Sequence, residues 1–403
     1  QKSLGGSQHD EAKCIIQTLD SGYVIAGRTE SNDGDVTGNH GLEDAWVVKL
    51  NSKRELQWQK CFGGSGIERA TSIQQTIDGG YIISAIASSN DGDVSGDHLD
   101  SNFIYNAFDY WIIKLNSKGS IEWQKCFGGS NIEIATSIQQ TKDEGYIVAG
   151  YTNSNDGNVV GNHGLEDVWI VKLNSKGALQ WQKSLGGTDH DYASSIVQTQ
   201  DGGYIIAGGT YSNDGDVNGN HRNVGMTKDF WIVKLDNTGK LEWQRCLGGS
   251  EDEEAYSIKE TIDGSYIIAG YTNSNDGEVS GNHFNDSLGG TSYDYWVVKI
   301  SDTGALQWQK CMGGSDASPG ECANAVHATM GGGYILTGYT SSNDSDVSGN
   351  HGDIDYWVVK LNCIMPEVGP IGGPSNVCVG ATITLSDTAA AGSWNSSTGK
   401  ASV

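Results

Sequence analysis

The chain is built from six copies of one unit. The marker Gly-Gly-(Ser/Thr) recurs at intervals of about 60 residues, and its second glycine is Gly6, Gly64, Gly129, Gly187, Gly249 and Gly314. Long internal repeats of this kind are typical of proteins whose units stack linearly in a solenoid or circularly in a propeller. The repeat therefore restricts the fold before any single motif is considered.

Every unit contains the same series of short apolar segments. In the third unit these are residues 135–141, 145–150, 167–173 and 178–185, which are rich in Ile, Val, Tyr and Trp and are separated by Gly, Asn and Asp. Short β-branched and aromatic segments between turn residues predict β-strands. No stretch has a useful length of helical periodicity. The sequence therefore predicts an all-β chain of four-stranded units.

The two ends of the repeat region favour a closed ring. The sixth unit leaves the pattern after its third strand, residues 355–361, while residues 1–6 match residues 182–187 of a fourth strand. We therefore predict a six-bladed β-propeller over residues 1–362, in which the N-terminal strand, residues 1–5, completes blade six and removes the open sheet edge. We also expect further polypeptide, including a signal peptide, before this strand.

Residues 363–403 have a different character. Three of the four prolines, Pro366, Pro370 and Pro374, lie here, and residues 381–386 have the composition of a strand. We predict a linker and the beginning of a second β-module, because a complete immunoglobulin-like sandwich needs about 100 residues.

Two segments resemble known propeller families. Residues 234–243 (KLDNTGKLEW) resemble the tryptophan-docking turn of quinoprotein-type propellers, and residues 70–83 with the following strand resemble a kelch unit. The whole chain resembles the long-blade propeller repeats of secreted bacterial surface proteins, and residues 363–403 resemble the opening of their Ig-like modules. The resemblance implies the fold and a secreted or cell-surface location. It does not extend to quinone binding, because quinoprotein-type enzymes generally have eight shorter blades.

Acidic residues concentrate in the loop between the second and third strands of each unit. This loop reads Ser-Asn-Asp-(Gly/Ser)-(Asp/Asn/Glu)-Val-x-Gly-(Asn/Asp)-His and ends at Asp-x-Trp. Calcium takes about six to eight oxygen ligands from such side chains and from carbonyl groups. The candidate calcium ligands are Asp33, Asp35, Asn39, Asp44, Asp91, Asp93, Asp109, Asp156, Asn158, Asp167, Asp214, Asp216, Asp229, Asp276, Glu278, Asp294, Asp344, Asp346 and Asp355. Asn-Asp-Gly also forms Asx-turns without any metal, so both interpretations stay open.

Three other repeated residue types are expected to be structural. One histidine closes each acidic loop, and a zinc site needs three or four converging ligands, so we expect these histidines to make hydrogen bonds within the scaffold. The tryptophans of the third and fourth strands are expected to pack the blades together. The third-strand lysines, Lys49 and its equivalents, are expected to form a solvated outer band. Cys61, Cys126, Cys246 and Cys311 share one repeat position and are expected to be buried free thiols.

Charge and loop length suggest where a ligand would bind. Loops after strands two and four open on the same face of a propeller, and we call this face, with its Ser-Asn-Asp loops, the acidic face. A formal net charge of −25 and the lack of a long apolar run argue against nucleic-acid binding and membrane insertion. Units two, four and five have longer loops before Asp-x-Trp, and long loops often carry binding residues. The candidate ligand-binding residues are Phe103, Tyr105, Phe108, Arg222, Phe284 and Tyr293.

The sequence contains no nucleophile elbow, zinc-protease motif or phosphate loop. We therefore expect a non-catalytic binding or adhesion scaffold with an extracellular protein or glycan as its partner, and calcium as its one candidate cofactor. The alternative is a polysaccharide lyase or hydrolase with its site on the acidic face.

Overall fold

The computed structural model describes residues 2–98, 107–221, 227–283, 293–315, 320–329 and 333–362. Contacts divide the chain into a large unit, Gln1–His327 with Leu336–Val359, and a small unit, Ala328–Ile335 with Lys360–Val403. The predicted second module, residues 363–403, lies outside the described residues. In the described ranges, no helix has the length and apolar character needed to cross a membrane.

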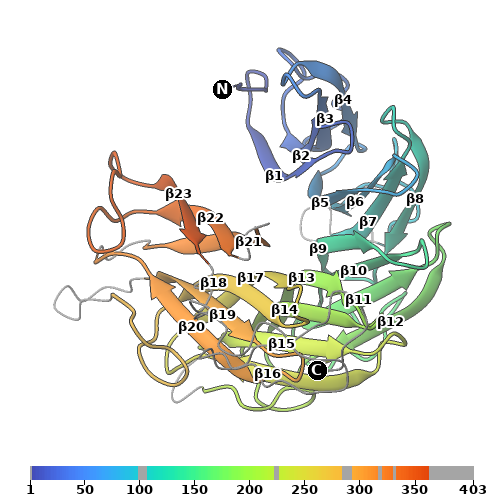
Figure 1. Cartoon of the computed structure of the whole chain (residues 1–403). Helices are drawn as coiled ribbons and strands as arrows, with labels where there is room; N and C mark the ends of the chain where they lie inside the picture. The colour runs from blue at the N-terminus through green and yellow to red at the C-terminus, as the bar shows by residue number, and fades with distance from the viewer. Residues whose placement is uncertain are drawn as a thin grey trace, which may run out of the picture. The chain divides into compact units, whose positions relative to one another are not determined.

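The strands form six antiparallel sheets, which are the six predicted blades (Figure 1). In chain order the strands are β1 (Asp10–Gln17), β2 (Tyr23–Thr29), β3 (Asp44–Leu50), β4 (Leu56–Phe62), β5 (Glu68–Gln75), β6 (Tyr81–Ala87), β7 (Asp109–Leu115), β8 (Ile121–Phe127), β9 (Glu133–Gln140), β10 (Tyr146–Thr152), β11 (Asp167–Leu173), β12 (Leu179–Leu185), β13 (Asp191–Gln198), β14 (Tyr204–Thr210), β15 (Asp229–Leu235), β16 (Leu241–Leu247), β17 (Glu253–Glu260), β18 (Tyr266–Thr272), β19 (Asp294–Ile300), β20 (Leu306–Met312), β21 (Cys322–Ala328), β22 (Tyr334–Thr340) and β23 (Asp355–Leu361). The all-β, six-bladed propeller is therefore confirmed.

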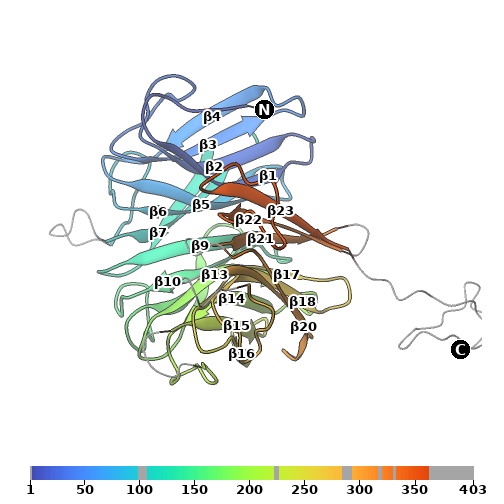
Figure 2. The same cartoon turned by 90° about the vertical axis from the view of Figure 1, so that its left-hand side faces the viewer.

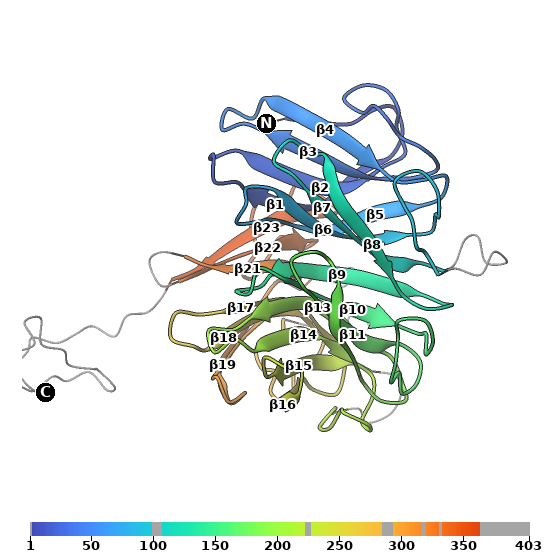
Figure 3. The same cartoon turned by 90° about the vertical axis from the view of Figure 1, so that its right-hand side faces the viewer.

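Consecutive blades meet through their innermost strands. Strand β5 contacts both β1 and β9, and β13 contacts both β9 and β17. The side views show β5, β9 and β13 following one another through the molecule (Figures 2 and 3). The six innermost strands therefore surround a common central region.

The hydrophobic core is divided into layers between neighbouring blades. One layer joins Val47 of blade one to Ile83 and Trp111 of blade two. Strand β7 is buried along its whole length, because another blade covers each of its faces. The third-strand tryptophans Trp111, Trp169, Trp231 and Trp296 are almost completely buried, which confirms their expected packing role.

Blade six differs from the prediction. Its described sheet has three strands, β21, β22 and β23, and residues 2–6 form no strand. Leu4 packs instead against the cluster of Trp46 and Val48 in blade one. Along β23, Tyr356 is 97% exposed and Val358 is 60% exposed.

The described part of the predicted closing strand 1–5, which is residues 2–5, therefore forms no strand. A complete fourth strand such as β4 carries three large apolar side chains, Leu56, Trp58 and Phe62, whereas residues 1–5 contain only Leu4. Since burial of apolar area is the main force that holds a strand in place, this short segment has little to gain from pairing with β23.

The third-strand lysines of blades one to four are buried, so the expectation of a solvated band is wrong for them, whereas Lys360 of blade six is exposed. Lys114 is only 3% exposed; its ammonium group donates to the backbone carbonyl of Leu115 at 3.0 Å and pairs with Asp78 at 2.8 Å. Lys49, Lys172 and Lys234 are buried in the same way. Their ammonium groups pair with the equivalent aspartates, Asp20, Asp143 and Asp201. An acidic residue in each β-turn makes the burial of the lysine tolerable.

Candidate functional site

The candidate calcium ligands of the Ser-Asn-Asp loops hold the chain segments that link the blades. The first aspartate of the loop accepts a hydrogen bond from the Ser or Thr of Gly-Gly-(Ser/Thr), as in Ser7 N to Asp33 Oδ1 at 2.7 Å. The other five aspartates in this role are Asp91, Asp156, Asp214, Asp276 and Asp344. These bonds also confirm that the loops and the linkers share one face.

The second loop position has a related role in several blades. Its side chain accepts a hydrogen bond of 3.3 to 3.4 Å from the first glycine of the linker, and the residues that do so are Asp35, Asn158, Asp216 and Glu278. Asn39 donates to the carbonyl oxygens of Thr29 and Ser31. Asp93 lines a cavity between blades one and two. The hydrogen bonds of the second loop position and of Asn39 therefore stabilise the turn and hold the adjoining linker in place.

The Asp-x-Trp aspartates are paired with the loop histidines, as expected for structural histidines. The Nδ1 atom of His98 lies 2.6 Å from Asp109 Oδ2, and this bond raises the pKa of His98. The equivalent pairs join Asp44 to His40, Asp167 to His163, Asp229 to His221, Asp294 to His283 and Asp355 to His351. Some histidines also reach the next blade: His221 Nε2 lies 3.3 Å from Glu278, and His283 Nε2 lies 3.8 Å from Asp346.

The described residues contain no group of three or more His, Cys, Asp or Glu side chains that would hold a metal ion. The turn interpretation accounts for the loop sequence through backbone and histidine partners. Calcium binding at these loops stays a prediction.

Only some of the candidate ligand-binding residues in the long loops lie within the described residues. Phe103, Tyr105, Arg222 and Phe284 lie outside the described residues. Phe108 is half-buried and accepts a backbone hydrogen bond from Glu133 at 2.6 Å, so it joins blades two and three. The ring of Tyr293 packs against Tyr271, with 4.6 Å between the centroids.

The innermost strands carry a feature that the sequence analysis missed. In blades one to five the pairing of the first two strands is interrupted by a β-bulge, and the unpaired residues are Lys13, Thr71, Thr136, Ser194 and Tyr256. A glycine faces the bulge in four of these blades; a Cβ atom on Gly208 would lie 1.8 Å from the carbonyl oxygen of Tyr192. Bulges re-aim side chains and are common beside active sites.

The bulged residues of five blades and Asn324 of β21 line one cavity of about 770 Å³. Glu11, Ile134, Tyr192 and Glu254, each two residues before a bulge, line it as well. These residues lie at the start of their strands, directly after the Gly-Gly linkers, so the cavity opens toward the acidic face. All six blades therefore contribute to one site, which we call the central cavity.

A sequence signal for this site was present. The bulged position and the position two residues before it vary from unit to unit, but the residue between them is always alanine: Ala12, Ala70, Ala135, Ala193, Ala255 and Ala323. Inside an otherwise repetitive strand, two variable positions around a constant small residue indicate side chains that are not needed for the scaffold.

Blade one gives the central cavity a charged wall, formed by Glu11 and Lys13, and ion pairs extend from this wall to residues of blades one and two that do not line the cavity. Arg28 pairs with Glu11 at 2.9 Å and with Glu43 at 2.8 Å, and Arg69 also pairs with Glu43, at 2.6 Å. Glu11 in addition pairs with Lys13 at 2.6 Å. Hydrogen bonds from Arg69 and Arg28 lower the pKa of Glu43 to about 2, so this carboxylate stays ionised.

Blades three to five give the cavity an aromatic wall. Tyr151 and Tyr192 meet edge to face with 4.9 Å between their centroids, and His190 stacks on Tyr192 at 6.0 Å. Glu254 accepts a hydrogen bond from the hydroxyl of Tyr256 at 3.1 Å and pairs with the ammonium group of Lys228.

Lys228 belongs to the long loop of unit four and interacts with aromatic rings beside the cavity. Its ammonium group lies 5.6 Å from the ring centroid of Tyr271 and 5.9 Å from that of Tyr211. These are cation–π distances. The long loop of unit four therefore contributes to the surroundings of the cavity, although through a residue that the sequence analysis did not select.

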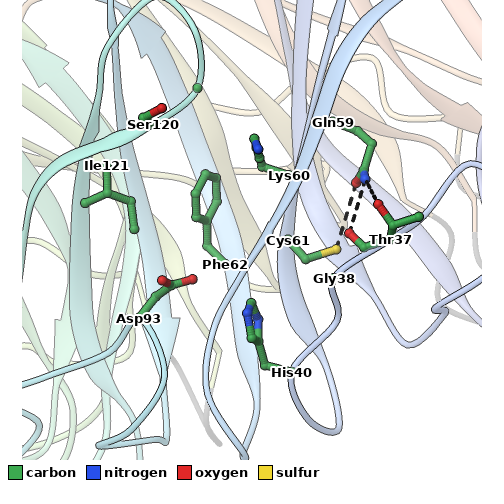
Figure 4. Close-up of a pocket in the computed structure, with 11 residues that line it drawn as sticks. Thr37, Gly38, His40, Gln59, Lys60, Cys61, Phe62, Asp93, Ser120 and Ile121 are labelled. Carbon is green, nitrogen blue, oxygen red and sulfur yellow. Dashed lines mark hydrogen bonds between the residues drawn. The ribbon is translucent and has the colours of Figure 1, made fainter.

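A smaller cavity of about 480 Å³ lies between blades one and two (Figure 4). His40, Cys61 and Asp93 line it, which are the residue types of a cysteine nucleophile and its base. Burial, together with the charges of Asp44 and Asp10, raises the pKa of Cys61 to about 12, so the thiol stays protonated and unreactive. Cys61, Cys126, Cys246 and Cys311 are all buried and free, as expected.

Comparisons with known proteins leave the family open. No family model matches the chain. The regulatory protein FlaEY of Caulobacter vibrioides is 27% identical over 169 residues, which cover 40% of this chain but only 17% of that protein. A protein of unknown function from Dyadobacter fermentans has 10% identity, a TM-score of 0.47 and coverage of 89% of this chain and 97% of its own. Another, from Bacteroides caccae, has 12% identity, a TM-score of 0.42 and coverage of 75% and 82%.

Proposed function

We propose that this protein is a non-catalytic binding module, secreted or displayed on a bacterial surface, that takes its ligand in the central cavity. One observation carries the proposal: the innermost strands of all six blades direct their variable side chains into a single cavity, while the residues that hold the blades together repeat. A symmetric scaffold can bind one asymmetric ligand only where its symmetry is broken, and the central cavity is such a place.

The ionic contacts of the cavity favour binding over hydrolysis. A glycosidase needs one carboxyl group that is protonated near neutral pH, and a raised pKa supplies it. In the central cavity, Glu11 is held by Lys13 and Arg28, which lower its pKa, and Glu254 is paired with Lys228. Glu11 is therefore suited to accept hydrogen bonds rather than to donate a proton.

The partner that we propose is an extracellular protein or glycan. A pocket within roughly 300–1,000 Å³ holds a small molecule or a short segment of a polymer, and the central cavity has about 770 Å³. The secreted location and the attached Ig-like module belong to the proposal through the resemblance of the repeats to bacterial surface proteins. Calcium at the Ser-Asn-Asp loops would stabilise the scaffold and is not required by the cavity.

The proposal is tested with labelled protein on arrays of bacterial and host glycans and of extracellular proteins. We expect binding that is lost in the double variant Tyr192→Ala/Tyr256→Ala and kept in the control Ile262→Ser, since Ile262 is 101% exposed and is not among the residues that line the cavity. Binding that survives the double variant would refute the site. Turnover of a glycan by the wild-type protein would refute the non-catalytic role.

A further inference from the structure

We infer that the ligand of the central cavity is an uncharged segment of a glycan, stacked on the aromatic wall of blades three to five. This inference rests on the proposed function and specifies the ligand. It follows from three properties of the cavity: its cations are already paired, its aromatic rings are neutral and fixed, and the strand edges around it are occupied.

The first property is charge compensation. Lys13 is the cation among the described residues that line the cavity, and its ammonium group lies 2.6 Å from Glu11. The two lining carboxylates are further paired with cations outside the lining, Glu11 with Arg28 and Glu254 with Lys228. An anionic ligand would have to separate one of these pairs, which leaves a partly buried carboxylate without its partner. The excess of negative charge in the chain also repels anions. A uronate, sulfated sugar or nucleic acid is therefore disfavoured.

The second property is the aromatic wall. Tyr151, Tyr192 and Tyr256 are half-buried and line the cavity. Burial raises the pKa of Tyr192 and of Tyr256, so their hydroxyl groups stay neutral. Tyr192 is fixed by the stacked ring of His190 and by the edge of Tyr151. Rigid tyrosines offer a flat apolar face and a polar edge, which matches the two faces and the hydroxyl rim of a pyranose ring.

The charged wall complements this arrangement. The paired side chains of Glu11, Lys13 and Glu254 present fixed acceptors and donors, and Thr71, Ser194 and Asn324 add neutral ones. Such groups discriminate between ligands because a hydroxyl that is missing leaves a desolvated polar group without a partner. A ligand rich in hydroxyl groups satisfies both walls at once.

The third property argues against an extended peptide. Peptides often bind by adding a strand to a free sheet edge. Here, side chains of neighbouring blades cap the edges of the innermost strands: Gln198 N donates to Gln139 Oε1 at 2.6 Å, Val326 N donates to Ser257 Oγ at 3.3 Å, and the Thr136 hydroxyl donates to the carbonyl of Ala193 at 2.7 Å. Backbone groups that a peptide would use are already bonded.

The test is calorimetric titration of the full chain with neutral oligosaccharides (cello-, xylo-, manno- and laminari-hexaose), with an oligogalacturonate and with a proline-rich peptide. We expect at least one neutral oligosaccharide to bind, with a Kd that changes less than twofold between 50 and 500 mM NaCl. Tyr192→Ala should weaken this binding at least tenfold, and Tyr192→Phe should restore it, since the ring supplies the stacking face. Thermal melting of both variants checks that they fold.

Three outcomes would overturn the inference. The first is that none of the neutral oligosaccharides binds. The second is that only the oligogalacturonate binds, with strong dependence on salt. The third is that the peptide binds in a way that Tyr192→Ala abolishes; this result would refute the glycan but keep the proposed function. If a probe binds the wild type and is bound equally well by the Tyr192→Ala and Tyr256→Ala variants, the proposed function itself is refuted.

Discussion

Asp229 and Glu253, from neighbouring blades, each direct one carboxyl oxygen at the same glycine, Gly248. A Cβ atom at Gly248 would lie 2.9 Å from Asp229 Oδ1 and 2.4 Å from Glu253 Oε2. Both carboxyl groups are completely buried, and Asp229 Oδ1 has no hydrogen-bond partner among the described residues. The same arrangement recurs between blades at Asp44 and Glu68, Asp109 and Glu133, Asp167 and Asp191, and Asp294 and Glu321.

These buried carboxyl pairs predict that the propeller is less stable at neutral than at mildly acidic pH. Burial raises the pKa of Asp229 to about 6 and, together with the Asp229 charge, that of Glu253 to about 7. Because these values exceed those of the unfolded chain, the groups contribute stability below about pH 4, and this contribution is lost as the pH rises through 6 and 7. For Glu253 the loss is on the order of 3 kcal/mol.

The measurement is urea unfolding between pH 4 and pH 8. We expect the free energy of unfolding to fall across this range. Salt-bridged carboxylates such as Glu43, with a pKa of about 2, are ionised in both the folded and the unfolded chain above about pH 5, so they do not mask a fall between pH 5 and pH 8. A free energy of unfolding that rises from pH 5 to pH 8 would contradict the assignment.

The variant Glu253→Gln isolates one of these pairs. Glutamine keeps an oxygen that can accept the hydrogen bond from Gly249 N, but it does not ionise beside Asp229. We expect the variant to be more stable than the wild type at pH 8 and to have a flatter pH profile. Glu251→Gln, at an exposed position in the same linker, is the matched control and should leave the profile unchanged. Identical profiles for both variants would refute the role of Glu253.

Two adjacent glycines test the bulge that shapes the central cavity. A Cβ atom on Gly208 would lie 1.8 Å from the backbone oxygen of Tyr192, whereas nothing lies within 3.6 Å of a Cβ atom on Gly209. Gly208→Ala should therefore destabilise the protein by about 3 kcal/mol, and Gly209→Ala by less than about 0.5 kcal/mol. Chemical unfolding measures both, and equal effects would mean that the bulge is not required.

A chelator distinguishes the two interpretations of the Ser-Asn-Asp loops. The first loop aspartates accept hydrogen bonds from backbone N–H groups, as Asp214 does from Thr188 at 2.8 Å, so a metal is not needed to satisfy them. The turn interpretation predicts a melting temperature that stays the same in EDTA and in millimolar calcium. A rise of several degrees with calcium, together with bound calcium by elemental analysis, would establish the metal sites instead.

The sequence predicted the repeated blades and the structural role of the loop histidines, but it missed the burial of the lysines and the bulges of the innermost strands. Six units of alternating apolar segments and turn glycines determine the blades, and the pairing of each loop histidine with a structural partner follows from its single occurrence per blade. The prediction of a closing strand was wrong because it rested on the similarity of residues 1–6 to residues 182–187. This similarity does not determine how much apolar surface residues 1–5 can bury. The burial of the third-strand lysines was not predicted, because their aspartate partners lie about 30 residues away along the chain.

The central cavity could not be predicted from composition or loop length. Its residues are ordinary strand residues such as Thr71 and Ser194, and only the bulge turns them toward the axis. The sequence analysis searched long loops for a ligand site, and of its two described candidates, Phe108 and Tyr293, Tyr293 packs against Tyr271 near the cavity.

In β1, β5, β9, β13 and β17, the bulged residue is skipped in the pairing with the adjacent strand. Its replacement therefore leaves the paired residues on either side of it in register, and these neighbours keep the blade intact. Duplication of an ancestral blade would give every copy one position free to diverge at little cost to folding. Such a ring can acquire new ligands by single substitutions, one blade at a time, and its specificity can evolve almost independently of its stability.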